Sequence, residues 1–286
     1  MKKIIIPTDF SKNAWNTITY AIELYKNTPC EFYLLNAYDL DPVQLLTTVS
    51  SQRVGHFYGM QKKESEHGLE KILEEIQNYK SNLYHTFKTI SKRGPLVSVI
   101  NELMEKSPYD MLIIGTKGAT GAKEFFLGSN TQNVIKTIDC CPILVIPEDF
   151  SFQKISEIAF ATDFERLYHK SEVEPILEFA KKHDATIRMI HIYDEPKLDT
   201  VQQYNSSTLE HYFKHVKYEF HVIPDFSTIE NTIQAFIEEL EIDILMMIYY
   251  KHSFLERILK EPVIKKMTFH TNIPFLVIPE DTTTVY

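Results

Sequence analysis

Short runs of apolar residues alternate with segments of helical spacing along the whole chain. The runs are rich in isoleucine, valine, leucine and phenylalanine and are bounded by turn residues, which is typical of buried strands. Between them, apolar residues recur at helical spacing, as at Ala14, Ile18, Ala21 and Tyr25. We predict strands at 3–7, 31–37, 86–91, 110–114 and 142–147, then at 155–161, 186–192, 218–222, 243–248 and 274–278. We predict helices at 11–27, 61–80, 95–107 and 129–138, then at 170–183, 205–217, 226–240 and 255–268.

The pattern of the first half recurs in the second. Residues 4–10 (IIIPTDF) return at 158–164 (IAFATDF), and residues 142–149 (PILVIPED) return at 274–281 (PFLVIPED). Strands that alternate with helices predict an α/β fold with a parallel sheet covered on both faces. We therefore predict two domains, 1–150 and 151–286.

Strand 110–114 runs directly into a loop rich in glycine. Four of the eight glycines in the chain lie there: Gly115, Gly118, Gly121 and Gly128. Ser129, Asn130 and Thr131 then supply an N-cap and the first turn of helix 129–138. Glycine lets backbone N–H groups approach an anion, and a helix N-terminus favours negative charge. The segment therefore indicates a phosphate cradle; the alternative is an ordinary strand-to-helix connection.

The net charge limits the kinds of molecule that the protein is expected to bind, and the cysteines indicate whether it carries disulfides. A net charge of −9 argues against general affinity for nucleic acid or an anionic membrane surface. The apolar run near the N-terminus is shorter than a signal sequence or a membrane span, so we expect a cytoplasmic protein. Cys30, Cys140 and Cys141 form no disulfide framework and are read as small buried residues; the adjacent pair has an alternative reading as a redox switch.

The glycine pattern identifies a family resemblance. Gly115, Gly118, Gly128 and Ser129 form Gly-x2-Gly-x9-Gly-Ser. Together with Pro-Thr-Asp after the first strand and the closing PILVIP, this resembles the universal stress protein family in its tandem form. The resemblance implies two Rossmann-like, doubly wound domains, each with a five-stranded parallel sheet of order 3-2-1-4-5. Strands 1 and 4 then meet at a topological switch point, where ligands bind beyond the carboxyl ends.

Resemblance to the ATP-binding branch of the family implies the site residues. The glycine loop would hold the phosphates and ribose through Gly115, Gly118, Gly128, Ser129, Asn130 and Thr131. Thr8, Asp9 and Ala37 would line the adenine and ribose. Lys117 either adds charge to a phosphate or lies in solvent, and Asp9 is alternatively part of the N-cap region of helix 11–27, which Ser11 also fits. The ligand would be ATP, ADP or AMP, with Mg²⁺ on the phosphates; no cluster fixes protein ligands for the metal.

The second half departs from this pattern because residues 151–286 contain no glycine. Ile248 stands opposite Gly115, and Lys251 opposite Gly118, so side chains obstruct the approach that a phosphate needs. We therefore expect a structural or regulatory second domain. The family commonly dimerises through its last strand, so strands 142–147 and 274–278 would form a pseudo-dimer within the chain, and a homodimer is also expected.

The function implied is that of a nucleotide-binding regulator of the stress response. The loop lacks Gly-Lys-Ser/Thr, and no base or arginine is placed to activate water, so slow ATP hydrolysis is the most we expect. The alternative is a ligand-independent scaffold of the same fold. The long segment 40–60 is read as a loop that folds over the nucleotide as a lid.

Overall fold

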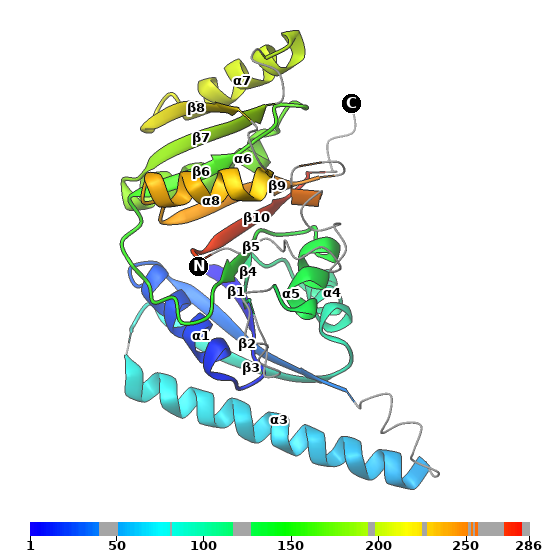
Figure 1. Ribbon diagram of the computed structural model, residues 1–286. Helices are drawn as coiled ribbons and strands as arrows, with labels where there is room; N and C mark the ends of the chain where they lie inside the picture. Colours follow the sequence, from blue (N-terminus) through cyan, green and yellow to red (C-terminus); the bar gives the residue numbers. More distant parts are fainter. Residues whose placement is uncertain are drawn as a thin grey trace. The chain divides into compact units, whose positions relative to one another are not determined.

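The computed structural model describes residues 1–39, 51–80, 82–116, 127–193, 198–224, 228–250, 253, 255–256 and 272–281 (Figure 1). The chain divides into two compact units. Unit 1 contains the elements from β1 to α5, and unit 2 contains those from β5 to β10.

Unit 1 is a parallel sheet with helices on both faces. Its strands are β1 (Lys2–Pro7), β2 (Cys30–Tyr38), β3 (His85–Arg93) and β4 (Met111–Gly115), in the order β3-β2-β1-β4. Its helices are α1 (Lys12–Leu24), α3 (Ser51–Tyr79), α4 (Leu96–Lys106) and α5 (Ser129–Thr137). α1 and α3 lie against one face, and α4 and α5 against the other (Figure 1). Such a sheet is buried on both sides, which is why its strands read as continuous apolar runs.

β1 is the central strand of this unit. Ile4 pairs in parallel with Phe32 of β2 on one side and with Met111 of β4 on the other. Ile4, Ile5 and Ile6 have no exposed surface, as expected for a strand covered on both faces. The chain leaves β1 toward β2 on one face and enters β4 on the other, so the carboxyl ends of β1 and β4 adjoin at a switch point.

Unit 2 repeats this arrangement and adds one antiparallel strand. Its strands are β5 (Ile143–Ile146), β6 (Glu157–Ala161), β7 (Thr186–Tyr193), β8 (Tyr218–Pro224), β9 (Ile244–Tyr249) and β10 (Phe275–Pro279), in the order β5-β10-β9-β6-β7-β8. Its helices are α6 (Lys170–His183), α7 (Thr200–Phe213) and α8 (Ile229–Glu239). β6 to β10 pair in parallel, whereas β5 runs antiparallel to β10 with Leu144 opposite Leu276.

The α/β class and the parallel sheets confirm the prediction from the sequence pattern. The predicted boundary between 150 and 151 follows the sequence repeat, whereas the compact units separate earlier, between Cys141 and Pro142. The reason is the pairing of β5 with β10, which joins the last strand of the first repeat to unit 2. Predicted helix 255–268 lies outside the described residues beyond Glu256.

α3 begins earlier than predicted. The prediction placed a loop at 40–60 and a helix at 61–80, but residues 51–60 are helical and only 40–50 lie outside the described residues. Gly55 and Gly59 interrupt the helical pattern, because glycine lowers helix stability. Both are exposed here, and a Cβ atom added to either would have no neighbour within 4 Å. A lid formed by the whole of 40–60 is therefore wrong. Of the described helices, α3 included, none combines enough length and apolar character to cross a membrane.

Candidate functional site

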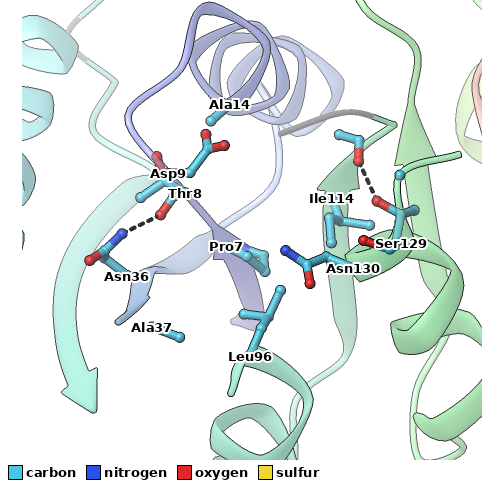
Figure 2. A pocket seen from close by; sticks show the side chains of 13 residues that line it. Pro7, Thr8, Asp9, Ala14, Asn36, Ala37, Leu96, Ile114, Ser129 and Asn130 are labelled. Carbon is cyan, nitrogen blue, oxygen red and sulfur yellow. Dashed lines mark hydrogen bonds between the residues drawn. The ribbon is translucent and has the colours of Figure 1, made fainter. Parts of the chain in front are cut away.

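A cavity of about 320 Å³ opens at the switch point of unit 1 (Figure 2). It lies at the carboxyl ends of β1, β2 and β4 and at the first residues of α4 and α5. Eight of the predicted site residues line it: Thr8, Asp9, Ala37, Gly115, Gly128, Ser129, Asn130 and Thr131. Lys117 and Gly118, also predicted, lie outside the described residues. Segments that are far apart in the sequence therefore meet where the fold places ligands.

The turn after β1 forms one side of the cavity. The Thr8 N–H donates to Leu35 O at 2.8 Å, which continues the β1–β2 ladder, and Thr8 Oγ1 accepts the Phe10 N–H at 3.1 Å. Asp9 Oδ1 accepts the Ser11 N–H at 3.0 Å. Ser11, whose Oγ accepts the Ala14 N–H at 3.2 Å, is the N-cap of α1. The alternative role of Asp9 as the cap is thus taken by Ser11, and the exposed Asp9 carboxylate lines the cavity.

Phe10 connects this turn to α3. Its φ of 66° lies in the left-handed region, which is uncommon for a bulky residue. A Cβ atom on Gly68 would lie 2.5 Å from Phe10 Cζ, so the ring packs directly on the backbone of α3. A side chain at position 68 would displace the Phe10 ring, so the glycine allows this ring to pack on α3 beside Asp9.

Asn36, near the end of β2, was missed by the sequence analysis. It is 8% exposed, lines the cavity, and donates from Nδ2 to Thr8 O at 2.7 Å (Figure 2). This bond ties the β1 turn to β2. The signal in the sequence was a lone amide directly after the apolar and aromatic run at 32–35.

The segment from β4 to α5 forms the other side. A Cβ on Gly115 would lie 2.7 Å from Asn13 Nδ2 and 3.0 Å from Thr17 Oγ1, so this glycine is needed for the close packing of α1. The buried Thr131 hydroxyl donates to Gly115 O at 2.8 Å, and the Gly128 N–H donates to Thr116 O at 2.6 Å. The Thr131 bond thus ties the first turn of α5 to the end of β4 on this side of the cavity.

α5 directs its N-terminus at the cavity. The helix begins at Ser129, so its N-cap is Gly128, one residue earlier than the sequence indicated. No side chain forms a capping hydrogen bond at this end. The first N–H groups of a helix lack intrahelical acceptors and carry a partial positive charge. Glycine at the cap leaves this end open to an anion.

Apolar side chains line the cavity between these two polar sides. Pro7 and Leu96 lie between the Asp9–Asn36 side and the Ser129–Asn130 side in Figure 2. Ala14, Ala37 and Ile114 complete the apolar lining. Among the described lining residues Asp9 is the one charged side chain. An apolar wall with an anion-binding helix end at one side suits a ligand that carries a ring and a negatively charged group.

The sequence matches the universal stress protein family over residues 1–147, which is more than half of the chain. The chain belongs to the universal stress protein family. A universal stress protein of Methanocaldococcus jannaschii is 30% identical over 145 residues, which cover 51% of this chain and 81% of the relative. One from Synechocystis sp. is 24% identical over 300 residues, covering 96% of this chain and 99% of the relative. Membership of the family supports a role in the stress response.

A solved structure extends the likeness to the whole chain. The crystal structure of a universal stress protein from Archaeoglobus fulgidus matches with a TM-score of 0.71 at 19% identity, covering 97% of this chain and 98% of the other. At this identity the match shows a shared fold. The Rossmann-like architecture of the universal stress proteins therefore holds for this chain.

Unit 2 builds the same turn as unit 1 in this universal stress protein. Phe164 also has a positive φ, 56°, and its N–H donates to Thr162 Oγ1 at 3.2 Å. Asp163 Oδ1 accepts the Glu165 N–H at 3.2 Å. Thr162 O is held at 3.0 Å by His191 Nδ1, which must carry the proton because a carbonyl oxygen only accepts. His191 therefore does in unit 2 what Asn36 does in unit 1.

The crevice of unit 2 is filled by its own side chains. Asp163 is 4% exposed and accepts hydrogen bonds from the hydroxyl groups of Tyr250 and, at 3.4 Å, Tyr168. The Arg166 guanidinium lies 4.5 Å from the centroid of the Tyr250 ring. The remaining cavity is about 10 Å³, too small for a nucleotide. The sequence analysis expected side chains to obstruct this crevice. One of them is the Tyr250 phenol, which donates a hydrogen bond to Asp163.

Burial keeps both phenols neutral. Desolvation raises the pKa of Tyr250 above its usual range, and the nearby Tyr168 and Asp163 raise it further. Desolvation also raises the pKa of Tyr168, with a further contribution from the Asp163 charge. Both groups therefore remain protonated hydrogen-bond donors to the Asp163 carboxylate at neutral pH.

Tyr250→Phe is expected to lower the free energy of unfolding by about 1.5–3 kcal/mol, the worth of a hydrogen bond to a charged group. The substitution keeps the ring but removes the donor to Asp163. Urea denaturation measures the effect. Tyr204→Phe is the matched control, because Tyr204 is 66% exposed on α7. Equal stability of the two variants would show that the Tyr250–Asp163 bond does not stabilise unit 2.

Proposed function

We propose that this universal stress protein binds ATP in the cavity of unit 1 and acts as a regulator or sensor in the stress response. The observation that carries the proposal is the convergence of the β1 turn, the end of β2 and the N-terminus of α5 on one cavity. The apolar wall formed by Pro7, Ala37 and Leu96 suits a planar base, and Asp9 can accept hydrogen bonds from ribose hydroxyls.

The phosphates would lie at the α5 N-terminus. Gly128 and Ser129 present the helix end there, and the charge that Lys117 would add stays a prediction. ADP and AMP carry the same base and ribose, so they are weaker ligands of the same site under this proposal. Mg²⁺ would reach the site on the phosphates, since the described residues contain no group of three or more side chains that could hold a metal ion.

Rapid hydrolysis is not part of the proposal. Among the described lining residues there is no lysine, arginine or histidine that could stabilise or activate groups at a γ-phosphate. Binding of ATP without rapid hydrolysis fits a protein whose nucleotide-bound form is recognised by another molecule. The filled crevice of unit 2 favours a second, ligand-independent role for that unit as a scaffold.

Calorimetric titration with ATP, adenosine and inorganic tripolyphosphate, each with Mg²⁺, tests the proposal. ATP is expected to bind more tightly than either fragment, because the cavity offers both an apolar wall and an anion-binding helix end. If tripolyphosphate binds as tightly as ATP, the cavity recognises the phosphates alone and not the base or the ribose. If none of the three binds, the cavity has no nucleotide function, and the scaffold reading of the whole chain replaces the proposal.

A further inference from the structure

Three sulfur atoms meet at the ends of α4 and α5 in unit 1. Cys140 Sγ lies 2.9 Å from Met104 Sδ, and the side chain of Cys141, the next residue, is close enough to lower the pKa of the Cys140 thiol. Met104 stands in the last turn of α4, and the two cysteines follow the end of α5. We call Met104, Cys140 and Cys141 the sulfur cluster. It lies at the opposite ends of these helices from the nucleotide cavity.

Ordinary packing does not account for the sulfur cluster. Cys30 is fully buried and behaves as a small apolar residue, as the sequence analysis expected of all three cysteines. That expectation holds for Cys141, which is 4% exposed, but is wrong for Cys140, which is exposed. The cluster thus pairs a thiol that solvent can reach with a buried thiol and a thioether on a neighbouring helix.

The donor set decides which ligand fits. Thiolate and thioether are soft ligands, and together they select Cu(I) over hard cations. Zinc prefers cysteine, histidine and carboxylate in fourfold coordination, and no group of three or more such side chains that could hold a metal occurs in the described part of the chain. Cu(I) tolerates lower coordination numbers, so two thiolates and one thioether suffice.

We propose that the sulfur cluster binds Cu(I). Cys140 offers the entry point from solvent, Cys141 supplies the second thiolate, and Met104 completes the set from α4. Binding displaces the thiol protons to solvent, and the copper stays in the Cu(I) state throughout. A disulfide between Cys140 and Cys141 is the competing fate of the two thiols, but it would leave the contact with Met104 without a role.

The test is an anaerobic titration of the reduced full-length protein with Cu(I) in competition with the chelator bicinchoninate. The wild type is expected to take about one Cu(I) per chain and to gain a sulfur-to-copper charge-transfer absorption. Cys140→Ser should weaken binding roughly a hundredfold, which corresponds to about 2.7 kcal/mol. Met104→Leu, a swap that preserves volume, should weaken it roughly tenfold, or about 1.4 kcal/mol.

Two matched variants show whether the effect is local. Met60→Leu removes a methionine on the exposed surface of α3, and Cys30→Ala removes the cysteine outside the cluster. Both should bind Cu(I) as the wild type does. The proposal is overturned if wild-type protein with three titratable thiols fails to compete with the chelator, or if Met104→Leu binds as tightly as Met60→Leu. It is also overturned if Cys140→Ser binds Cu(I) as tightly as the wild type does.

Discussion

Gly128→Asp is expected to abolish ATP binding while leaving unit 1 folded. Gly128 is the N-cap of α5 with a φ of −57°, which any residue adopts, and aspartate is a favourable N-cap. Its carboxylate would stand where the proposal places the phosphates. Repulsion between charges a few ångströms apart predicts a loss of affinity of at least roughly a hundredfold, or about 2.7 kcal/mol. Calorimetric titration with ATP measures the loss, and thermal unfolding checks the fold.

Gly128→Asn is the matched control because asparagine has nearly the same shape and also caps helices well. It should lose less than roughly tenfold in affinity, since it adds bulk without charge. Equal losses in the two variants would mean that the side chain blocks the cavity sterically and that no phosphate lies there. An aspartate variant that still binds ATP as the wild type does would contradict the placement of the phosphates.

Asn36→Leu should destabilise unit 1 and weaken ATP binding together. The substitution preserves shape but removes the donor to Thr8 O, which leaves a buried carbonyl without this 2.7 Å bond. We expect a loss of about 1–3 kcal/mol in the free energy of unfolding. Each kcal/mol corresponds to about 2–4 °C in melting temperature for a domain of this size class. ATP affinity should fall as well, because the released turn carries Asp9.

Asn36→His provides the discriminating comparison. In unit 2, His191 already holds the equivalent Thr162 O at 3.0 Å in the same kind of turn. Histidine at position 36 should therefore recover part of both the stability and the ATP affinity that leucine loses. If histidine performs no better than leucine, the bond to Thr8 O is not what positions the turn.

The fold could be predicted because its signals are local and repeated. The buried strands read as short apolar runs, and the repeat of IIIPTDF as IAFATDF predicted two similar sheets. The start of α3 could not be predicted in the same way. Gly55 and Gly59 interrupt the helical pattern there, and two exposed glycines are tolerated within a helix of 29 residues.

The part of the candidate site that depends on glycine and on a helix start could be predicted from the sequence. The glycine-rich run and the helix start indicated Gly115, Gly128 and Ser129, whereas Thr8 and Asp9 were predicted from the family resemblance; all five line the cavity. Asn36 and Leu96 were missed because their roles depend on which strands and helices become neighbours. Tyr250 illustrates the same limit, since only the fold shows that its hydroxyl reaches Asp163 from the end of β9.

Calorimetric titration of the nucleotide-free, full-length protein with ATP and Mg²⁺ tests the central claim most directly. Bound nucleotide carried through purification must first be removed and its absence checked. The account predicts saturation at about one ATP per chain, because the cavity of unit 1 is open and Tyr250 fills that of unit 2. Two equivalents per chain would contradict the filled crevice, and the absence of binding would contradict the nucleotide site itself.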